Sequence, residues 1–402
     1  MRSRTADDVR DVDAGAFFGD ELPVLIRDRA DLAVAGGREL NVRPFGIDVD
    51  GSGWTLALDD DTFTVRAGLD DAHAVVRLTA EQFADLVNDL VTPMGFFTGG
   101  TLVMPKGRLD HFLDWWVVLR SLLDGVRAHT AGAVDFRDRD GEPLELSRGF
   151  GVDDDPDDIA HFLAEAGFLH LRGVFSDDEM AAVAADMDAA AADYEPGDGR
   201  SWWAKTVDGT DRLVRMQYFQ TKSATVTDLL ADDRFTRIGR FTDDQHRFGK
   251  PGSNKNLVEA LVKPIGIVEG ISDVPWHKDC SLGSHSYRCC SLTTGISVTG
   301  ADAQSGQLRV VAGSHRALIQ PAFVRKGLDL PQLDLPTVTG DVTVHLSCTL
   351  HMSQPPVDRE RRVLYTDFRL PDDGRDPGEG KLARIREAAP VTVSQPPATT
   401  AR

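Results

Sequence analysis

The fold is decided by five short runs in the last third of the chain: NLVEALVKPIGIV (256–268), SLTTGISV (291–298), GQLRVVAG (306–313), DVTVHLSCTLH (341–351) and RRVLYTDFRL (361–370). Each run is rich in Val, Ile, Leu or Thr, and Gly, Asp and Pro stand between the runs, which is the pattern of short strands joined by turns. Strands of this length and spacing are typical of a jelly roll, in which two sheets face each other. We therefore expect a mainly-β domain here.

Helices flank these strands on the N-terminal side. The first is predicted over 156–166, and the strand-like run GFLHLRGVF (167–175) follows it. Ser176 and Glu179 then form a capping box, in which each side chain satisfies a backbone N–H of the other. An Ala-rich helix is expected from there to about residue 193.

The first part of the chain has another pattern. Three runs alternate apolar and polar residues, as a half-buried antiparallel sheet does: GWTLAL (53–58), TFTVRA (62–67) and AVVRL (74–78). A second capping box, Thr79 with Gln82, opens a helix, and a further helix over 108–124 places its apolar residues on one face. A sheet followed by helices predicts an α+β unit.

These patterns divide the chain. We expect the α+β domain over 1–130, a polar linker over 131–148 and the jelly-roll domain over 149–380. Residues 381–402 lack apolar content, so a disordered tail is predicted there.

The sequence Trp276-His277-Lys278-Asp279 carries the strongest chemical signal. On a strand, residues i and i+2 face the same side, so His277 and Asp279 are expected to point together into the jelly roll. An H-x-D pair is common on protein surfaces, and it needs a third ligand to make a metal site. His351 is the best candidate, and two histidines with one carboxylate form the facial triad of non-haem iron(II) enzymes.

The stretch that follows His351 provides a second signal. Arg362 lies eleven residues beyond it and Ser353 lies two beyond it. A guanidinium fork and a hydroxyl are suited to the distal carboxylate of a dicarboxylic cosubstrate.

Residues from about 150 to 370 resemble the phytanoyl-CoA dioxygenase family of 2-oxoglutarate-dependent oxygenases. The matching segments are GFLHLRGVFSDDEM, VKPIGIV, PWHKD, SGQLRVVAGSH, GDVTVH, and LHMSQPP followed by Arg362. The resemblance implies a double-stranded β-helix (cupin-like) core, Fe(II) at His277, Asp279 and His351, and 2-oxoglutarate held by Arg362 and Ser353, with O2 as the other cosubstrate. It also places Arg215 near the cosubstrate.

One position departs from the family pattern. Gly295 stands where relatives often carry a bulky aromatic residue, so either the pocket is roomier there or a neighbouring residue fills the space.

The N-terminal unit, at about 40–127, resembles the sterol-carrier-protein-like domains. The similarity lies in the W-x-L-x-L run, the VRAG turn, AVVRLTAEQFADLV and the aromatic helix. Relatives often enclose an apolar cavity, whereas a packed core explains Phe112, Trp115 and Trp116 equally well.

Other candidate residues have simpler explanations. His285, His315 and His345 are alternative candidate ligands that we expect not to bind the iron, and His315 in the GSH turn is expected to be structural. Cys280 is expected to pack on the side away from the metal. The sequence is equally compatible with two roles for Trp202, Trp203 and Tyr218, burial in the core or a place in a substrate lid.

Composition limits the partners. The formal net charge of −20 disfavours nucleic acid and anionic membrane surfaces. No apolar run is long enough to span a bilayer, and no signal-peptide pattern is present, so a cytoplasmic protein with a small-molecule substrate is expected. The sequence indicates no oligomeric state.

These observations predict a dioxygenase that hydroxylates, or otherwise oxidises, an unactivated C–H bond of a small apolar or amphipathic metabolite, as in secondary metabolism. Two alternatives stay open. One is a non-catalytic protein that binds a lipid or small molecule in the N-terminal unit, and the other is a jelly-roll metalloenzyme that does not use 2-oxoglutarate.

Overall fold

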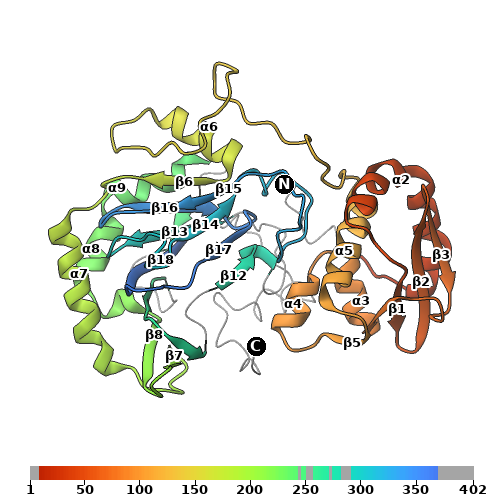
Figure 1. Cartoon of the computed structure of the whole chain (residues 1–402), viewed down its shortest axis with the longest axis horizontal. Coiled ribbons are helices and arrows are strands. Elements are labelled where there is room, and N and C mark those ends of the chain that lie inside the picture. Colours follow the sequence, from red (N-terminus) through yellow and green to blue (C-terminus); the bar gives the residue numbers. More distant parts are fainter. Residues whose placement is uncertain (1–8, 243–245, 250–256, 271–273, 282–290, 370–402) are drawn as a thin grey trace.

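The computed structural model describes residues 9–242, 246–249, 257–270, 274–281 and 291–369, and the expected tail at 381–402 and His285 lie outside these ranges. The described chain forms two lobes, an N-terminal unit and a larger β-rich unit, which lie side by side (Figure 1).

The N-terminal unit is a five-stranded sheet covered by helices. Its sheet order is β3-β2-β1-β4-β5, with β1 and β4 parallel and the other pairs antiparallel. The elements are α1 (Ala14–Ala16), the π-helical turn η2 (Phe17–Glu21), α2 (Leu22–Glu39), β1 (Phe45–Val49), β2 (Ser52–Asp59), β3 (Thr62–Ala67), β4 (Ala74–Leu78), α3 (Ala80–Val87), α4 (Pro93–Thr98), β5 (Val103–Lys106) and α5 (Leu109–Asp124).

The core of this unit is tightly filled. Phe45 and Phe112 are both fully buried and stack with ring centroids 5.5 Å apart. The cavity bounded by Phe17, Phe83 and Trp116 has a volume of only about 10 Å³, which is room for a single water molecule. The described residues therefore form a packed core at this position.

The β-rich unit contains a large and a small sheet. The large sheet runs β11-β7-β8-β10-β18-β13-β16-β6, with β9 added beside β18, and the small sheet runs β12-β17-β14-β15. The strands are β6 (Phe168–Leu171), β7 (Ser201–Thr206), β8 (Asp211–Met216), β9 (Arg247–Phe248), β10 (Glu259–Lys263), β11 (Ile267–Glu269), β12 (Val274–His277), β13 (Leu292–Ser297), β14 (Leu308–Val311), β15 (Gln332–Leu335), β16 (Val342–Leu346), β17 (His351–Ser353) and β18 (Arg361–Arg369).

Helices cover the outer face of the large sheet (Figure 1). They are α6 (Pro156–Ala166), α7 (Asp177–Ala190), η3 (Ala191–Asp193), η4 (Phe219–Thr221), α8 (Ala224–Ala231), α9 (Asp233–Thr236) and η5 (Arg237–Phe241), and η6 (Asp279–Ser281) follows β12. Both capping boxes that the sequence predicts are formed, at the starts of α3 and α7. The expected double-stranded β-helix arrangement of two facing sheets is confirmed.

The segment 131–148 lies along the β-rich unit. Arg316 donates to the backbone oxygen of Asp135 at 2.9 Å, and its guanidinium lies 5.3 Å from the Phe136 ring. Leu144 and Leu146 pack against the core of the β-rich unit. This segment is therefore held by side-chain contacts along its length.

Strand alternation gives the two faces of the large sheet different characters. Register places Tyr365 of β18 opposite Gly295 of β13 and Glu259 of β10, on the face toward the small sheet. The intervening residues, such as Ile296 and Leu364, pack into the apolar core under the helices. The face toward the small sheet holds the candidate site.

Candidate metal centre

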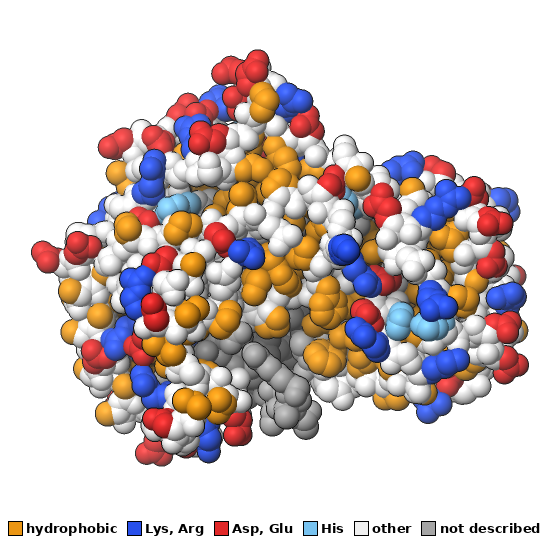
Figure 2. All heavy atoms as spheres, viewed as in Figure 1, with side chains coloured by type: hydrophobic (Ala, Val, Ile, Leu, Met, Phe, Trp, Pro, Cys, Tyr) orange, Lys and Arg blue, Asp and Glu red, His pale blue; other side chains and the backbone are white. Residues whose placement is uncertain are grey.

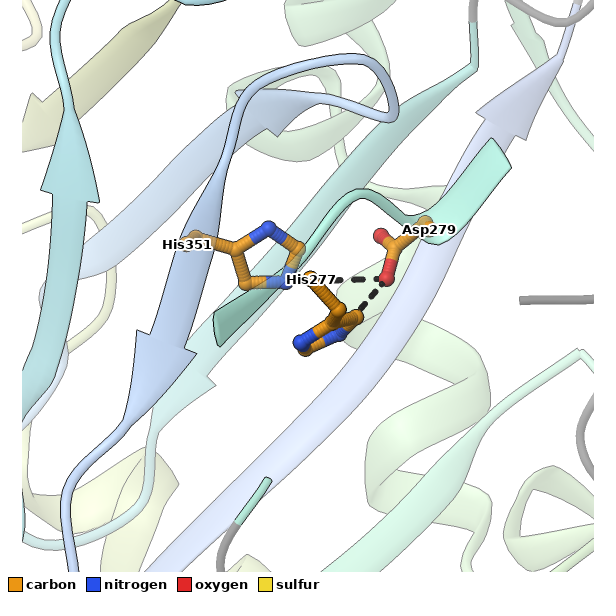
Figure 3. A group of neighbouring side chains, drawn as sticks. All are labelled: His277, Asp279 and His351. Carbon is orange, nitrogen blue, oxygen red and sulfur yellow. Dashed lines mark ion pairs between the residues drawn. The ribbon is translucent and has the colours of Figure 1, made fainter. Parts of the chain in front are cut away.

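The structure brings His277, Asp279 and His351 together. Each offers one ligand atom, and these atoms lie within 4.8 Å of one another. Asp279 Oδ1 is 3.2 Å from His277 Nε2 and 3.5 Å from His351 Nε2. Figure 3 shows the two imidazoles and the carboxylate pointing toward one another.

Local backbone structure differs from the expectation at one ligand. Strand β12 ends at His277, and Asp279 is the first residue of the 3-10 turn η6. The shared direction of the two side chains therefore comes from the turn that follows the strand, and not from strand alternation. His351 is the first residue of β17, which pairs with β12 so that His277 and His351 are register partners.

Backbone carbonyls orient both imidazoles. His277 Nδ1–H donates to Pro275 O at 2.7 Å, and His351 Nδ1–H donates to Thr349 O at 3.0 Å. Because Nδ1 is hydrogen-bonded to a carbonyl, Nε2 is the nitrogen of each ring that faces Asp279. This arrangement, a ligand histidine fixed by a backbone oxygen, is usual around protein-bound metals.

The outer oxygen of Asp279 is also held. Thr293 Oγ1 donates to Asp279 Oδ2 at 2.7 Å, and His345 Nε2 lies 3.4 Å from the same oxygen. Since Oδ2 has these neighbours, Oδ1 is the oxygen that faces the two histidines. His345 thus lies beside the carboxylate, and not in the group of three ligand atoms.

Electrostatics favour the ligand forms of two of these residues. Burial alone would raise the pKa of Asp279, but the imidazoles of His351, His277 and His345 outweigh it and hold the pKa well below its usual range. Burial, followed by repulsion from His345 and His277, lowers the pKa of His351 well below its usual value. A charged carboxylate and a neutral imidazole are the forms that bind a metal.

The structure places Arg362 away from this site, which corrects the sequence-based expectation. Arg362 Nη1 lies 2.7 Å from Asp188 of α7, on the helix-covered face of the large sheet. Its neighbour Arg361 faces the inside instead, where it is buried and donates from Nη1 to Gly306 O at 2.8 Å. Since side chains alternate along β18, only one of the two arginines can face inward.

Arg361 has the chemistry expected of an anion-binding residue. Its Nη2 donates to the Tyr365 hydroxyl at 3.3 Å, while its buried Nε has no hydrogen-bond partner among the described residues. A buried donor without a partner is costly, so the position suits a ligand that supplies an acceptor.

Ser353 lies on the inside, two residues beyond His351. It accepts a hydrogen bond from Lys263 Nζ at 2.7 Å. Lys263 is 1 % exposed and is the register partner of Arg361, so two buried cations lie side by side on adjacent strands. Sequence reasoning missed Lys263, although its place in the alternating run EALVK could have indicated an inward residue.

Arg215 also lies on this face. It pairs with Glu259 at 2.9 Å, and its guanidinium stacks 4.0 Å from the Trp202 ring. Trp202 is buried in this stack, whereas Trp203 Nε1 donates to Ser201 Oγ. Arg215 therefore has a carboxylate partner within the described residues.

Gly295 is compensated by a neighbour. A Cβ built at Gly295 would lie 3.1 Å from Tyr365 Cε1 and 3.0 Å from Thr343 Oγ1. The Tyr365 ring thus occupies the space beside Gly295.

His315 Nε2 lies 2.8 Å from Ala164 O, in the position of a donor that joins the GSH turn to helix α6.

Comparison with known proteins adds family information. Residues 163–363, half of the chain, match the family described as phytanoyl-CoA dioxygenase (PhyH). No curated protein sequence matched the chain.

Solved structures resemble the chain at low sequence identity. AviO1 from Streptomyces viridochromogenes Tue57 is 20 % identical, with a TM-score of 0.42, over 56 % of this chain and 97 % of its own. The alpha ketoglutarate-dependent epimerase SnoN from nogalamycin biosynthesis is 20 % identical, with a TM-score of 0.41, over 56 % of this chain and 90 % of its own. EctD from S. alaskensis is 19 % identical, with a TM-score of 0.42, over 54 % of this chain and 78 % of its own.

None of the helices that the structure describes is sufficiently long and apolar to cross a membrane.

Proposed function

The chain belongs to the phytanoyl-CoA dioxygenase family of iron- and 2-oxoglutarate-dependent oxygenases, and from this premise we propose that it hydroxylates an unactivated C–H bond of a small apolar or amphipathic metabolite. The observation that carries the proposal is the convergence of His277, Asp279 and His351 within 4.8 Å on the inside of the β-rich unit.

The three residues fit iron(II). Two Nε2 lone pairs and one carboxylate oxygen meet on one side, and this donor set is the facial triad that leaves coordination positions open. When bound there, iron(II) supplies the oxidative chemistry, in which 2-oxoglutarate, O2 and the substrate R–H give succinate, CO2 and R–OH. The protein residues fix the ligands through Pro275 O, Thr349 O and the Thr293 hydroxyl.

We assign the distal carboxylate of 2-oxoglutarate to Arg361, in place of Arg362. The support is the inward direction of Arg361, its buried Nε without a partner among the described residues, and the adjacent cation Lys263. Ser353 accepts its bond from Lys263, so its own hydroxyl hydrogen is available to donate to a carboxylate. A metalloenzyme without this cosubstrate has no need of two buried cations at this position.

The N-terminal unit, although its sequence resembles sterol-carrier-protein-like domains, is assigned a structural role. The cavity inside its core measures about 10 Å³ and has no room for a lipid chain, and the larger groove of about 590 Å³ along residues 10–25 is open to the surface and does not enclose a ligand.

The test is anaerobic reconstitution of the full-length protein with iron(II) and 2-oxoglutarate. We expect a visible charge-transfer band from the iron(II)–cosubstrate complex, and slow formation of succinate and CO2 once oxygen is admitted. A protein that holds iron but gives neither the band nor succinate would overturn the proposal. Screening apolar and amphipathic metabolites for faster succinate formation and for an added oxygen atom would then identify the substrate.

A further inference from the structure

The loop between β14 and β15 joins the two units. We call residues 318–325 of this loop the seam segment. On the side of the N-terminal unit, the His129 N–H donates to Leu318 O at 3.1 Å. Ala322 packs in one apolar cluster with Met94 of α4 and Leu113 of α5. The seam segment is therefore fixed to the N-terminal unit through both backbone and side-chain contacts.

Asp114 of α5 is the polar centre of this contact. Its carboxylate accepts hydrogen bonds from the Gln320 amide and the Arg325 guanidinium, both of the seam segment. Asp114 is 5 % exposed and Gln320 is 2 % exposed, so the bond between them is shielded from water, whereas the bond to Arg325 is only partly buried. Removing the carboxylate would leave the buried Gln320 amide and the partly exposed Arg325 guanidinium without their acceptor, which destabilises the arrangement of the segment.

The opposite side of the seam segment is hydrogen-bonded to the backbone of the segment that carries two of the candidate metal ligands. The Lys278 N–H donates to Pro321 O at 2.9 Å, and Lys278 stands between His277 and Asp279. Pro321 follows Gln320 directly, so only a few covalent bonds separate the Asp114 contact from the ligand segment 277–279. Helix α4 also lies beside η6, which carries Asp279.

The same loop holds the third ligand. Lys278 Nζ donates to Ser314 O at 2.8 Å, and Ser314 Oγ accepts from the N–H of Leu350 at 2.7 Å. Leu350 directly precedes His351. All three ligands are thus connected to one loop, and Asp114 anchors that loop from the other unit.

We propose that Asp114 is a positioning residue, through which the N-terminal unit sets the geometry of the metal-ligand segment 277–279. The N-terminal unit then supports the geometry of the metal centre through the seam segment, although none of its side chains belongs to the triad. This inference rests on the proposed function only in requiring that the triad bind a divalent metal.

The experiment is a cobalt(II) titration of the full-length protein, followed by the visible absorption of the bound ion. Asp114→Ala should weaken cobalt binding by about 10-fold, the lower end of the effect of residues that orient metal ligands from outside the site. Asp114→Asn keeps an acceptor for Gln320 but loses the charge opposite Arg325, so it should show an intermediate loss.

Asp329→Ala is the matched control. Asp329 also joins the units, because it accepts from His129 Nε2 at 2.8 Å and from the Gly132 N–H at 2.6 Å, but it lies outside the seam segment. Its loss should lower the melting temperature without changing cobalt affinity. Equal loss of affinity in Asp329→Ala and Asp114→Ala would show a general structural effect and overturn the proposal.

A second readout needs no metal. Hydrogen exchange of the apo protein measures the exchange rate of the Lys278 N–H. This rate should be higher in Asp114→Ala and unchanged in Asp329→Ala. If Asp114→Ala does not fold, Gln320→Ala tests the same contact from the β-rich unit. Wild-type cobalt affinity and wild-type exchange at Lys278 in a folded Gln320→Ala or Asp114→Ala protein would overturn the proposal. A wild-type protein that binds cobalt but forms no succinate would instead overturn the proposed function, while the cobalt titration still tests Asp114.

Discussion

The two units enclose their interiors in opposite ways. The N-terminal unit fills the space between its sheet and helices with aromatic and aliphatic side chains, among them Phe45, Phe83 and Phe112. The β-rich unit packs its helix-covered layer in the same manner, but the space between its two sheets holds ionisable residues, including Lys263, His345 and Arg361.

The two interiors differ in their main contribution, which is to stability in the N-terminal unit and to chemistry between the two sheets. Burying a charged group costs free energy unless partners compensate it, whereas an apolar side chain gains free energy from the same burial. The interior of the N-terminal unit therefore stabilises the fold, whereas the interior between the two sheets holds the ionisable residues of the candidate site. Figure 2 shows apolar side chains also gathering on the surface where the two lobes meet.

The largest effect is expected at the ligands. Single substitutions His277→Ala, Asp279→Ala and His351→Ala should each abolish metal-dependent succinate formation, because each removes one of the three ligand atoms that the structure brings within 4.8 Å of one another. The proteins should still fold, as circular dichroism would show. His161→Ala, which changes a histidine outside the two sheets, should retain activity. Near-wild-type succinate formation by any one ligand variant would remove that residue from the site.

The N-terminal core should respond in stability. Phe112→Ala removes a fully buried ring and should cost about 3–5 kcal/mol in the free energy of unfolding. The control Val103→Ala, at a side chain that is 48 % exposed, should change it by less than about 0.5 kcal/mol. Denaturant melts of both variants make the measurement. A small loss for Phe112→Ala would contradict a packed interior and revive a ligand cavity.

Substitutions of the two adjacent arginines test which of them faces the inside of the β-rich unit. Arg361→Ala should raise the apparent 2-oxoglutarate constant by an amount equivalent to about 2–4 kcal/mol, as expected for loss of a buried charge-assisted contact. Arg361→Lys keeps the charge without the fork and should show part of this loss. Arg362→Ala breaks partly exposed contacts with Asp188, Glu360 and the Ala184 carbonyl, all away from the triad, and should leave the constant unchanged. The reverse result would return the anchor to Arg362.

The smallest effect concerns the two capping boxes, one in each unit. Hydrogen bonds from Arg234, and then from the Ser176 N–H, lower the pKa of Glu179 to about 2. The folded-state pKa is thus below the ordinary value of 4.5, so the stabilisation is complete above pH 4.5 and is lost as the pH falls toward 2.

Glu179→Gln should therefore cost about 1 kcal/mol at neutral pH, and little at pH 2. The Thr79–Gln82 box has no charge, so Gln82→Ala should cost the same amount at both values of pH. Urea melts at the two pH values compare the variants. A pH-independent cost for Glu179→Gln would show that its charge does not contribute.

The sequence predicted the three candidate ligands that the structure brings together, because their residue types and order are specific, but it expected Arg362 to face inward, where the structure places Arg361. A strand alternates with a period of two, so an error of one residue in the start of β18 exchanges the inward and outward faces. The Pro-rich loop after Ser353 hides that start, because nothing local fixes how its residues are distributed between loop and strand.

Residues contributed by distant strands could not be found in the same way. Thr293 and His345 reach Asp279 only through the pairing of β13 with β16, which is a long-range register. The sequence indicated the three strands after Gly51 but not helix α2 or strand β1. Strand β1 is buried along its whole length and lacks the alternation of apolar and polar residues that identifies a half-buried strand.

The fit of Tyr365 against Gly295 limits the order in which this pocket can evolve or be redesigned. A Cβ at position 295 alone would lie 3.0 Å from Thr343 Oγ1 and 3.1 Å from Tyr365 Cε1, so these neighbours would have to shift by a few tenths of an ångström, and a larger side chain would need more room. A bulky side chain at position 295 therefore requires a smaller residue in place of Tyr365, and that replacement removes the hydroxyl that Arg361 contacts. Exchange of the aromatic ring from one strand to the other passes through an intermediate with weakened support for Arg361, so the two positions are expected to change together and to show epistasis in directed evolution.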